Sequence, residues 1–138
     1  MLDSLSMLEL EGFVVIVHIA DVLAGIIGVG IIAIGIRFML RPQAGATGYG
    51  VSIPPGQGVY AYLCVKGVRD IASGLVTLGL LFAAPAHLLG LFLILQAATP
   101  IGDNVIVLAN KGKPAVAFGV HGATAAVMIV LGVLLLRS

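Results

Sequence analysis

Four apolar runs, each long enough to cross a lipid bilayer as a helix, constrain the fold of this chain more than any other feature. They cover residues 13–40, 60–84, 86–109 and 115–136. A helix of about 20 residues spans a hydrocarbon core of about 30 Å. Helices are expected because backbone groups in lipid must be bonded within the segment, and the runs lack the alternation of barrel strands. The pattern predicts an all-α fold, an integral membrane four-helix bundle.

Composition supports a lipid environment for these helices. Only 9% of the residues are charged and 60% are hydrophobic, whereas a soluble domain carries about 25% charged residues. So few polar groups cannot cover a globule in water. We therefore expect a single transmembrane domain over residues 1–138, surrounded by membrane lipid. Such a multi-pass protein would lie in the cell membrane if the source is bacterial.

The first run is predicted to remain on the mature protein as a span. The residues before it include Asp3, Glu9 and Glu11, whereas a secretory signal begins with basic residues. The run is also much longer than the apolar stretch of a signal peptide. Cleavage before the bundle is therefore not expected.

Prolines mark the breaks between the runs. Arg41-Pro42 is expected to end the first helix, since the residue before a proline is kept out of the helical region. Pro85 predicts a tight turn at 84–86, and Pro114 suits the first position of the last helix. The connection 42–59 is long and rich in glycine. A connection of this length is usually a functional lid or a mobile linker.

The distribution of Lys and Arg predicts the orientation of the bundle. With four spans, the two termini and the 84–86 turn share one side, which carries Arg137. The residues on the other side are Arg37, Arg41, Lys66, Lys111 and Lys113. Cytoplasmic loops carry the excess of basic residues. Both termini are therefore predicted on the non-cytoplasmic side.

Small residues four apart predict where helices pack closely in lipid. One ridge on the first span consists of Ala20, Ala24 and Gly28, and one on the last span consists of Ala115, Gly119 and Ala123. These ridges favour a compact bundle, and a ridge left over can serve a homo-oligomer.

Ionisable side chains inside the spans form the candidate site. A charge near the bilayer centre costs about 2.5–3.5 kcal/mol, so it needs a reason to be there. At 100° per residue the polar residues of each span lie on one face. They are Lys66, Arg69, Asp70, Ser73 and Thr77; Gln96, Thr99 and Asp103; and His121 and Thr124, with Arg37 near the end of the first span. The charged and histidine residues among them are expected to meet at one level of the bundle: Arg37, Lys66, Arg69, Asp70, Asp103 and His121.

Pairings within this cluster can be predicted from direction. Arg69 and Asp70 point about 100° apart, so Arg69 is expected to pair with Asp103 across the bundle. Asp70 can take Lys66 one turn back or His121 from the last span. The alternative is that these charges only lock the register of the helices.

Other classes of site are not supported by the sequence. A net charge of +1 without a basic block gives no reason to expect nucleic acid. Cys64 is alone, so neither a disulfide nor a cysteine metal cluster is expected. His18, Asp21 and His87 form a smaller polar group at the other end, but their spacing dictates no metal site. No metal and no cofactor is predicted.

Four segments resemble a known family of small membrane proteins. They are GIRFMLRPQA (35–44), YLCVKGVRDIASGL (62–75), PIGDNVIVL (100–108) and GVHGATAAVMIV (119–130). From about Gly35 onward the chain is similar to the family labelled domain of unknown function 4267, related to the DoxX-like group. The resemblance implies a four-helix membrane bundle and puts weight on five residues, Arg37, Arg69, Asp70, Asp103 and His121. It implies no activity. Some DoxX-like relatives are linked to redox chemistry, but this chain offers no cysteine pair to support it.

Three functional hypotheses follow. The first is a membrane protein that binds or converts a lipophilic small molecule by acid/base chemistry. Its proton-handling residues would be Asp70, Asp103 and His121. Its substrate-binding residues would be Arg37, Lys66, Arg69, Gln96 and Thr99. The second is a small oligomeric transporter or proton-coupled carrier, with His18 and Asp21 extending the path, and the third is an accessory or structural subunit.

Overall fold

The computed structural model describes residues 2–51, 54 and 56–138, and the side chains of Met7 and of the described residues from Leu10 onward. Every element in this part of the chain is helical, which confirms the all-α prediction. The elements are α1 (Leu2–Leu40), α2 (Pro42–Tyr49), α3 (Gln57–Ala83), α4 (Ala86–Gln96), α5 (Ala98–Ala109), α6 (Pro114–Val116), the π-helical turn η1 (Ala117–Gly122) and α7 (Ala123–Leu136). The side chains of Asp3 and Glu9, used above against a signal peptide, and part of the 42–59 connection lie outside the described residues.

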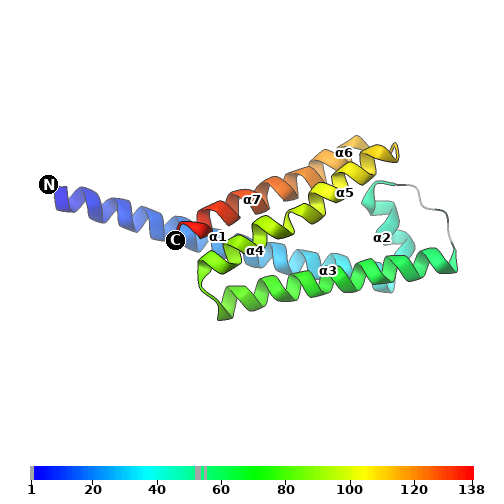
Figure 1. Cartoon of the computed structure of the whole chain (residues 1–138), viewed down its shortest axis with the longest axis horizontal. Coiled ribbons are helices and arrows are strands. Elements are labelled where there is room, and N and C mark those ends of the chain that lie inside the picture. Colours follow the sequence, from blue (N-terminus) through cyan, green and yellow to red (C-terminus); the bar gives the residue numbers. More distant parts are fainter. Residues whose placement is uncertain (1, 52–53, 55) are drawn as a thin grey trace.

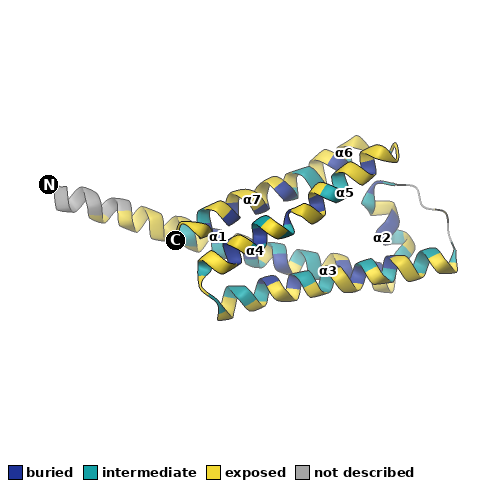
Figure 2. Ribbon diagram, viewed as in Figure 1, coloured by how far each residue is buried: buried dark blue, intermediate teal, exposed yellow. Residues whose placement is uncertain are grey.

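Two antiparallel pairs of helices build the molecule. The helix α3 lies along α1, and α7 lies along α4 (Figure 1). The N-terminal part of α1 extends beyond the other helices, and α2 folds back beside the far end of α1 and α3 (Figure 1). Exposed residues recur along every long helix (Figure 2). Many of them are large and apolar, such as Tyr62, Phe82 and Leu95. An outer surface of this kind suits lipid.

Three helical segments are long and apolar enough to cross a membrane: Leu10–Leu40, Ala86–Ala109 and Pro114–Leu136. The helix α3 is also long, with 27 residues, but Lys66, Arg69 and Asp70 interrupt its apolar run. Crossing by α3, and with it the count of four spans, stays a prediction. The same holds for the side on which the termini lie.

Glycines bring α1 and α3 into backbone contact. A Cβ atom added to Gly67 would lie 2.6 Å from the carbonyl oxygen of Gly35, and one added to Gly74 would lie 2.5 Å from that of Gly28. Both distances are far shorter than a van der Waals contact, so only glycine allows this approach. The glycines of each helix are seven residues apart, which keeps both contacts on one face.

The ridge predicted on the first span is confirmed and the one on the last span is not used within the chain. Ala20 and Ala24 are fully buried against Leu89, Leu93 and Met128. In contrast, Ala115, Gly119 and Ala123 are exposed. The glycine contact of the second pair is instead made by Gly90 and Gly132, whose carbonyl oxygens would each lie within 3 Å of the other's added Cβ. A role of the exposed ridge in an oligomer stays a prediction.

Prolines act where the sequence predicted them, but the 42–59 connection does not begin as a loop. The first helix ends at Leu40, and Pro114 stands at the start of α6. Pro42 begins α2, because its fixed φ suits the first helical position. Gly50 ends α2 with a φ of 100°, a left-handed conformation that favours glycine. The expectation of a lid or linker over this part is therefore corrected to a short packed helix.

Two irregularities interrupt the predicted spans at the level of the polar cluster. The run 86–109 breaks at Ala97, since Pro100 has no N–H to bond the carbonyl of Gln96. The last run begins with the π-helical turn η1, in which Ala123 N–H bonds the carbonyl of Phe118, five residues earlier. Such turns widen the helix locally and often occur at functional sites.

Candidate functional site

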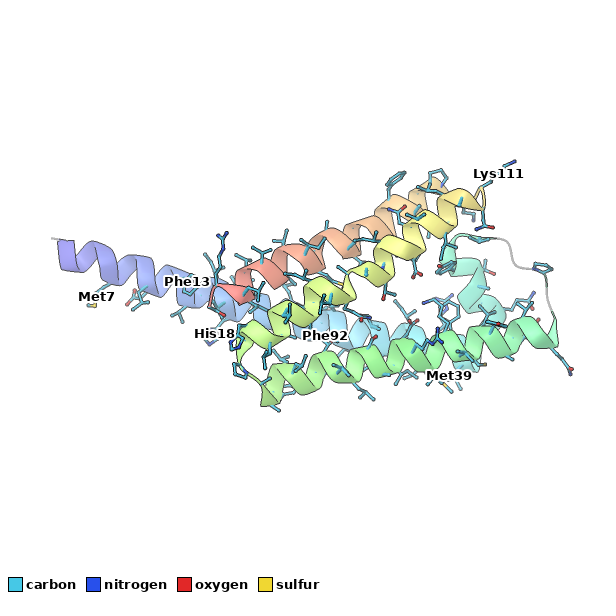
Figure 3. All side chains as sticks on the ribbon, viewed as in Figure 1. Met7, Phe13, His18, Met39, Phe92 and Lys111 are labelled. Carbon is cyan, nitrogen blue, oxygen red and sulfur yellow. The ribbon has the colours of Figure 1, made fainter. Side chains whose placement is uncertain are left out.

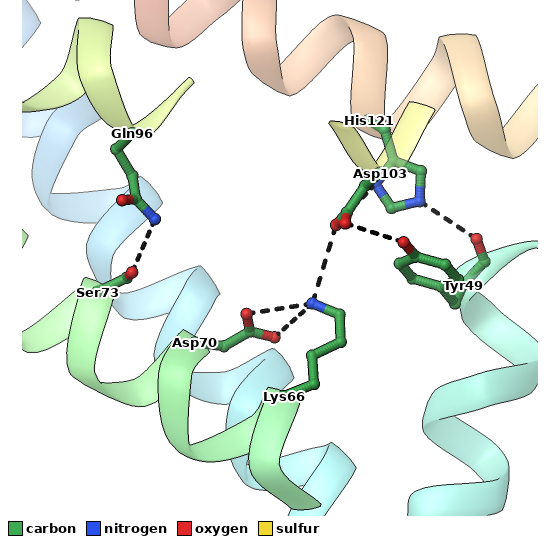
Figure 4. A network of polar contacts seen from close by, with 7 residues as sticks. All are labelled: Tyr49, Lys66, Asp70, Ser73, Gln96, Asp103 and His121. Carbon is green, nitrogen blue, oxygen red and sulfur yellow. Dashed lines mark hydrogen bonds and ion pairs between the residues drawn. The ribbon is translucent and has the colours of Figure 1, made fainter. Parts of the chain in front are cut away.

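Charged side chains from three separate elements meet at one end of the bundle. The Lys66 Nζ atom on α3 lies 2.9 Å from Oδ2 and 3.1 Å from Oδ1 of Asp70, one turn further along the same helix. It also lies 3.8 Å from Asp103 Oδ2 on α5, and His121 Nδ1 of η1 lies 3.8 Å from the same oxygen (Figure 4). Lys66 and His121 thus approach one carboxylate from different helices.

Tyr49, at the end of α2, completes the cluster from the segment that was expected to be a lid or linker. Its hydroxyl donates to Asp103 Oδ1 at 2.9 Å, and its carbonyl oxygen lies 3.2 Å from His121 Nε2 (Figure 4). The rings of Tyr49 and His121 meet edge to face, with centroids 5.1 Å apart. The carbonyl of Gly50 accepts from Lys113 N–H at 2.9 Å, which ties α2 to the turn before α6.

The sequence analysis missed Tyr49, although a signal was present. Pro42 and Gly50 bracket the eight residues of α2, and a proline at the start with a glycine just past the end is a helix signature. A helix there, rather than a loop, would have pointed to its last side chain as a contact for the bundle.

The geometry around His121 defines its tautomer. A carbonyl oxygen can only accept, so Nε2 carries a hydrogen and donates it to Tyr49 O at 3.2 Å. In neutral imidazole the other nitrogen, Nδ1, is then an acceptor. This nitrogen faces Asp103 Oδ2, which also only accepts when ionised. In these states both atoms are acceptors, so a donor group from a ligand can bond either of them.

A second polar contact lies deeper in the bundle. Gln96 Nε2 donates to Ser73 Oγ at 2.7 Å, joining the kink between α4 and α5 to α3 (Figure 4). Thr77 is fully buried and donates to the carbonyl of Ser73 at 2.9 Å. These contacts satisfy polar groups that would otherwise be buried without partners.

A cavity of about 200 Å³ opens beside the cluster. Its polar wall is formed by Arg37, Tyr49, Lys66, Asp70, Gln96, Thr99, Asp103, His121 and Thr124. Its apolar wall includes Ile31, Ile34, Phe38, Val120 and Met128. The side chains of Asp70, Asp103 and His121 are 12%, 18% and 12% exposed, so each is shielded from bulk solvent yet reachable from the cavity.

The predicted site residues divide into those brought together and one that is not. Lys66, Asp70, Asp103 and His121 are in contact, and Arg37, Gln96 and Thr99 line the same cavity. Asp70 takes Lys66, the first of its two predicted partners. Arg37 donates from Nη2 to the carbonyl of Ala44 at 3.3 Å. The functional roles assigned to these residues stay predictions.

The pairing predicted between Arg69 and Asp103 is wrong. Arg69 is exposed and does not line the cavity, and Lys66 takes its place beside Asp103. The physical reason is the helical period. Lys66 and Asp70, four residues apart, share one face of α3, whereas Arg69 points about 100° away from Asp70.

The smaller group at the other end forms no comparable cluster. His18 is exposed and its Nδ1 contacts the carbonyl of Val14 in its own helix at 2.9 Å. It lies at the end of the bundle away from Lys111 (Figure 3). Among the described residues, no three His, Cys, Asp or Glu side chains come together as metal ligands.

Tyr49 offers a titration test of the cluster, because α2 lies outside the helices that are long and apolar enough to span. Burial, and then the hydrogen bond to Asp103, raise the pKa of the Tyr49 hydroxyl above its ordinary value. The folded state therefore favours the neutral phenol. Its contribution to stability is complete below the unfolded pKa of about 10 and is lost as the pH rises above that value.

We expect the free energy of unfolding of the wild type to fall more steeply between about pH 10 and pH 11.5 than that of Tyr49→Phe. At neutral pH, Tyr49→Phe should be less stable by about 1.5 kcal/mol, because a hydrogen bond to a carboxylate is lost. Equilibrium unfolding in detergent, repeated across this pH range, measures both effects. Tyr62→Phe is the matched control, since Tyr62 is 81% exposed. Equal slopes for the wild type and Tyr49→Phe would contradict the Tyr49–Asp103 contact.

The fold and the cluster define the class of this protein. It is an all-helical protein with helices long and apolar enough to cross a membrane, and ionisable side chains gathered between them. The chain belongs to the family described as domain of unknown function (DUF4267), whose model matches residues 28–135. The match leaves out the first part of α1, which contains His18 and Asp21. No curated protein and no solved structure is significantly similar to the chain.

Proposed function

We propose that this protein holds a lipophilic small molecule in the cavity between its helices, with the polar end of that molecule against the charged cluster. The observation that carries the proposal is the composition of the cavity wall. Carboxylate, ammonium and imidazole groups line one side, and Ile31, Ile34 and Met128 line the other. Pockets for small organic ligands combine an apolar wall with a few convergent polar groups in this way.

The residues have distinct roles in this proposal. Asp103 and His121 lie side by side and can pass a proton to or from a bound group. Lys66 forms an ion pair with Asp70 and lies close to Asp103. Gln96 and Thr99 offer neutral hydrogen bonds further along the wall. Acid/base catalysis on the bound molecule, such as an isomerisation, needs no group beyond these.

We place the cluster within the membrane, with α1, α3, α4–α5 and α6–α7 as four spans and both termini on the non-cytoplasmic side. The asymmetry of Lys and Arg supports this orientation. The cavity then lies in the cytoplasmic half of the bilayer, where a lipophilic molecule can enter between helices.

A binding protein or enzyme is favoured over a carrier. The half of the bundle away from the cluster is closed by a core of apolar side chains, which includes Leu89, Leu93, Leu131 and Leu135, each no more than 4% exposed. A carrier needs polar groups on both sides of such a barrier. The cavity is lined by more polar side chains than are needed to fix the register of the helices. This argues against an accessory subunit.

The test is to identify what co-purifies with the protein. Wild-type protein purified in mild detergent from its host membrane is extracted with organic solvent and examined by mass spectrometry. We expect a small organic molecule at close to one per chain. The content should fall at least about tenfold in Asp103→Asn, because a charge-assisted contact is lost.

Two further variants make this test specific. Gly48→Leu should also empty the cavity, because Gly48 lines it and a Cβ there meets nothing within 4 Å. Asp21→Asn is the matched control on α1, outside the cavity lining, and should keep the molecule. The proposal fails if no molecule is retained by the wild type, or if Gly48→Leu and Asp103→Asn retain it as well as the wild type does.

A further inference from the structure

One oxygen of the cluster is left open toward the cavity. Asp103 Oδ1 accepts the Tyr49 hydroxyl at 2.9 Å, but Oδ2 has its two neighbours, Lys66 Nζ and His121 Nδ1, each at 3.8 Å. A charge-assisted hydrogen bond is about 2.7–2.9 Å long. Within the described residues, Oδ2 therefore lacks a donor at bonding distance, and it belongs to a side chain that lines the cavity. A donor that arrives through the cavity can bond it directly.

The charge around this oxygen favours a cation as that donor. Asp70 and Asp103 are two carboxylates, and Lys66 is the one ammonium within 4 Å of either of them in the part of the chain that is described. The groups that face Asp103 are Arg37 from α1, Tyr49 from α2, Lys66 and Asp70 from α3, and His121 from η1. The wall contributed by α7 is Thr124 and Met128, which carry no charge.

Arg37 does not neutralise the second carboxylate. Its side chain is exposed, and its Nη2 donates to the carbonyl of Ala44 on α2 rather than to an acid. His121 turns Nδ1 toward Asp103 Oδ2, while its Nε2 lies 3.2 Å from Tyr49 O. In the described part of the chain, Lys66 therefore stands as the single lysine or arginine beside two carboxylates.

Aromatic rings beside the cluster complete a surface that attracts ammonium groups. The Lys66 Nζ atom lies 5.1 Å from the centroid of the Phe38 ring and 5.6 Å from that of Tyr49. Both rings line the cavity. Aromatic faces within about 6 Å attract a cation through their quadrupole, most strongly where water is excluded. Lys66 itself demonstrates that this surface binds an ammonium group.

We propose that the molecule held in the cavity is a lipophilic amine, bound as its ammonium cation. This inference rests on the proposed function and names the class of its ligand. The ammonium group donates to Asp103 Oδ2 between Lys66 and His121, while the hydrocarbon part lies against Ile31, Ile34 and Met128.

Calorimetric titration of the purified wild-type protein with n-hexylammonium tests this proposal. Hexan-1-ol and hexanoate are the matched probes, with the same chain and a neutral or anionic head. We expect n-hexylammonium to bind at least about tenfold more tightly than either. Equal affinities for n-hexylammonium and hexan-1-ol would overturn the ammonium class.

Two variants assign the effect to residues. Asp103→Asn should lose at least about tenfold in affinity for n-hexylammonium. Asp21→Asn, outside the cavity, should behave as the wild type. The order of affinity of the three probes for the wild type remains decisive even if a variant does not fold.

The outcomes separate this inference from the proposed function. If hexan-1-ol or hexanoate binds best, and Gly48→Leu abolishes that binding, the cavity is a ligand site but the ammonium class is wrong. If n-hexylammonium binds best but Asp103→Asn binds it as tightly as the wild type, the contact with Asp103 is wrong. If none of the three probes binds, the inference is overturned, and the co-purified molecule alone decides the proposed function.

Discussion

Replacing Gly67 by leucine is expected to destabilise the protein by about 3 kcal/mol, the largest effect we expect from a single substitution. A Cβ atom at this position would lie 2.6 Å from the carbonyl oxygen of Gly35 and 2.9 Å from Cγ of Met39. The first neighbour is backbone and cannot turn away. The helices α1 and α3 must therefore separate, which removes their contact along its whole length. Since α1 and α3 carry Phe38, Lys66 and Asp70, ligand binding should be lost as well.

The measurement is equilibrium unfolding with SDS in mixed micelles, followed by circular dichroism and by the reactivity of the single cysteine, Cys64. Gly79→Leu is the matched control on the same helix, because a Cβ at Gly79 meets nothing within 4 Å. Its free energy of unfolding should stay within about 0.5 kcal/mol of the wild type, or rise, since glycine is a poor helix former. Equal stability of Gly67→Leu and Gly79→Leu would disprove the close approach of α1 and α3.

Replacing Lys66 by methionine is expected to destabilise the protein by about 2 kcal/mol at neutral pH. Removal of one partner of a fully buried ion pair costs about 3–5 kcal/mol, and Lys66 is 27% exposed, so the effect is smaller. The substitution leaves Asp70 and Asp103 facing each other across the cavity with no ammonium group between them. The same unfolding measurement reports the loss.

A second substitution distinguishes the charge from the packing of Lys66. Lys66→Met combined with Asp70→Asn should recover at least half of the lost stability, because the uncompensated carboxylate is removed. Arg69→Met is the matched control, since Arg69 is an exposed cation on the same helix, and it should change the free energy of unfolding by less than about 0.5 kcal/mol. A larger loss of stability for Arg69→Met than for Lys66→Met would instead support the pairing of Arg69 with Asp103.

The helical period was enough to predict most of the cluster. Lys66 and Asp70, Gln96 and Asp103, and His121 each lie on an inward face, as residues three, four or seven apart must. The lengths of the apolar runs and the positions of the turns placed these residues at one level of the bundle. The assignment of Arg69 failed because adjacent residues on one helix cannot both face the same cavity, and the sequence alone did not say which would turn inward.

The details that shape the site were not predicted. Tyr49 reaches Asp103 only because Pro42 and Gly50 delimit a helix that folds back over the bundle. The break at Ala97 and the π-helical turn around His121 were read as continuous helix. Each of these features depends on a few residues. Each turns a side chain far enough to decide whether that side chain reaches its partner.

The amino-acid sequence by itself determined the all-helical fold, the family and the residues able to form an ionisable cluster, because hydrophobicity and period act locally along the chain. Only the tertiary structure decided which cation stands between the carboxylates, which oxygen stays open and which tyrosine closes the site. These depend on contacts shorter than 4 Å between segments far apart in the chain. Such contacts are set by backbone approach at glycines and by small bends in helices, which no periodic pattern records.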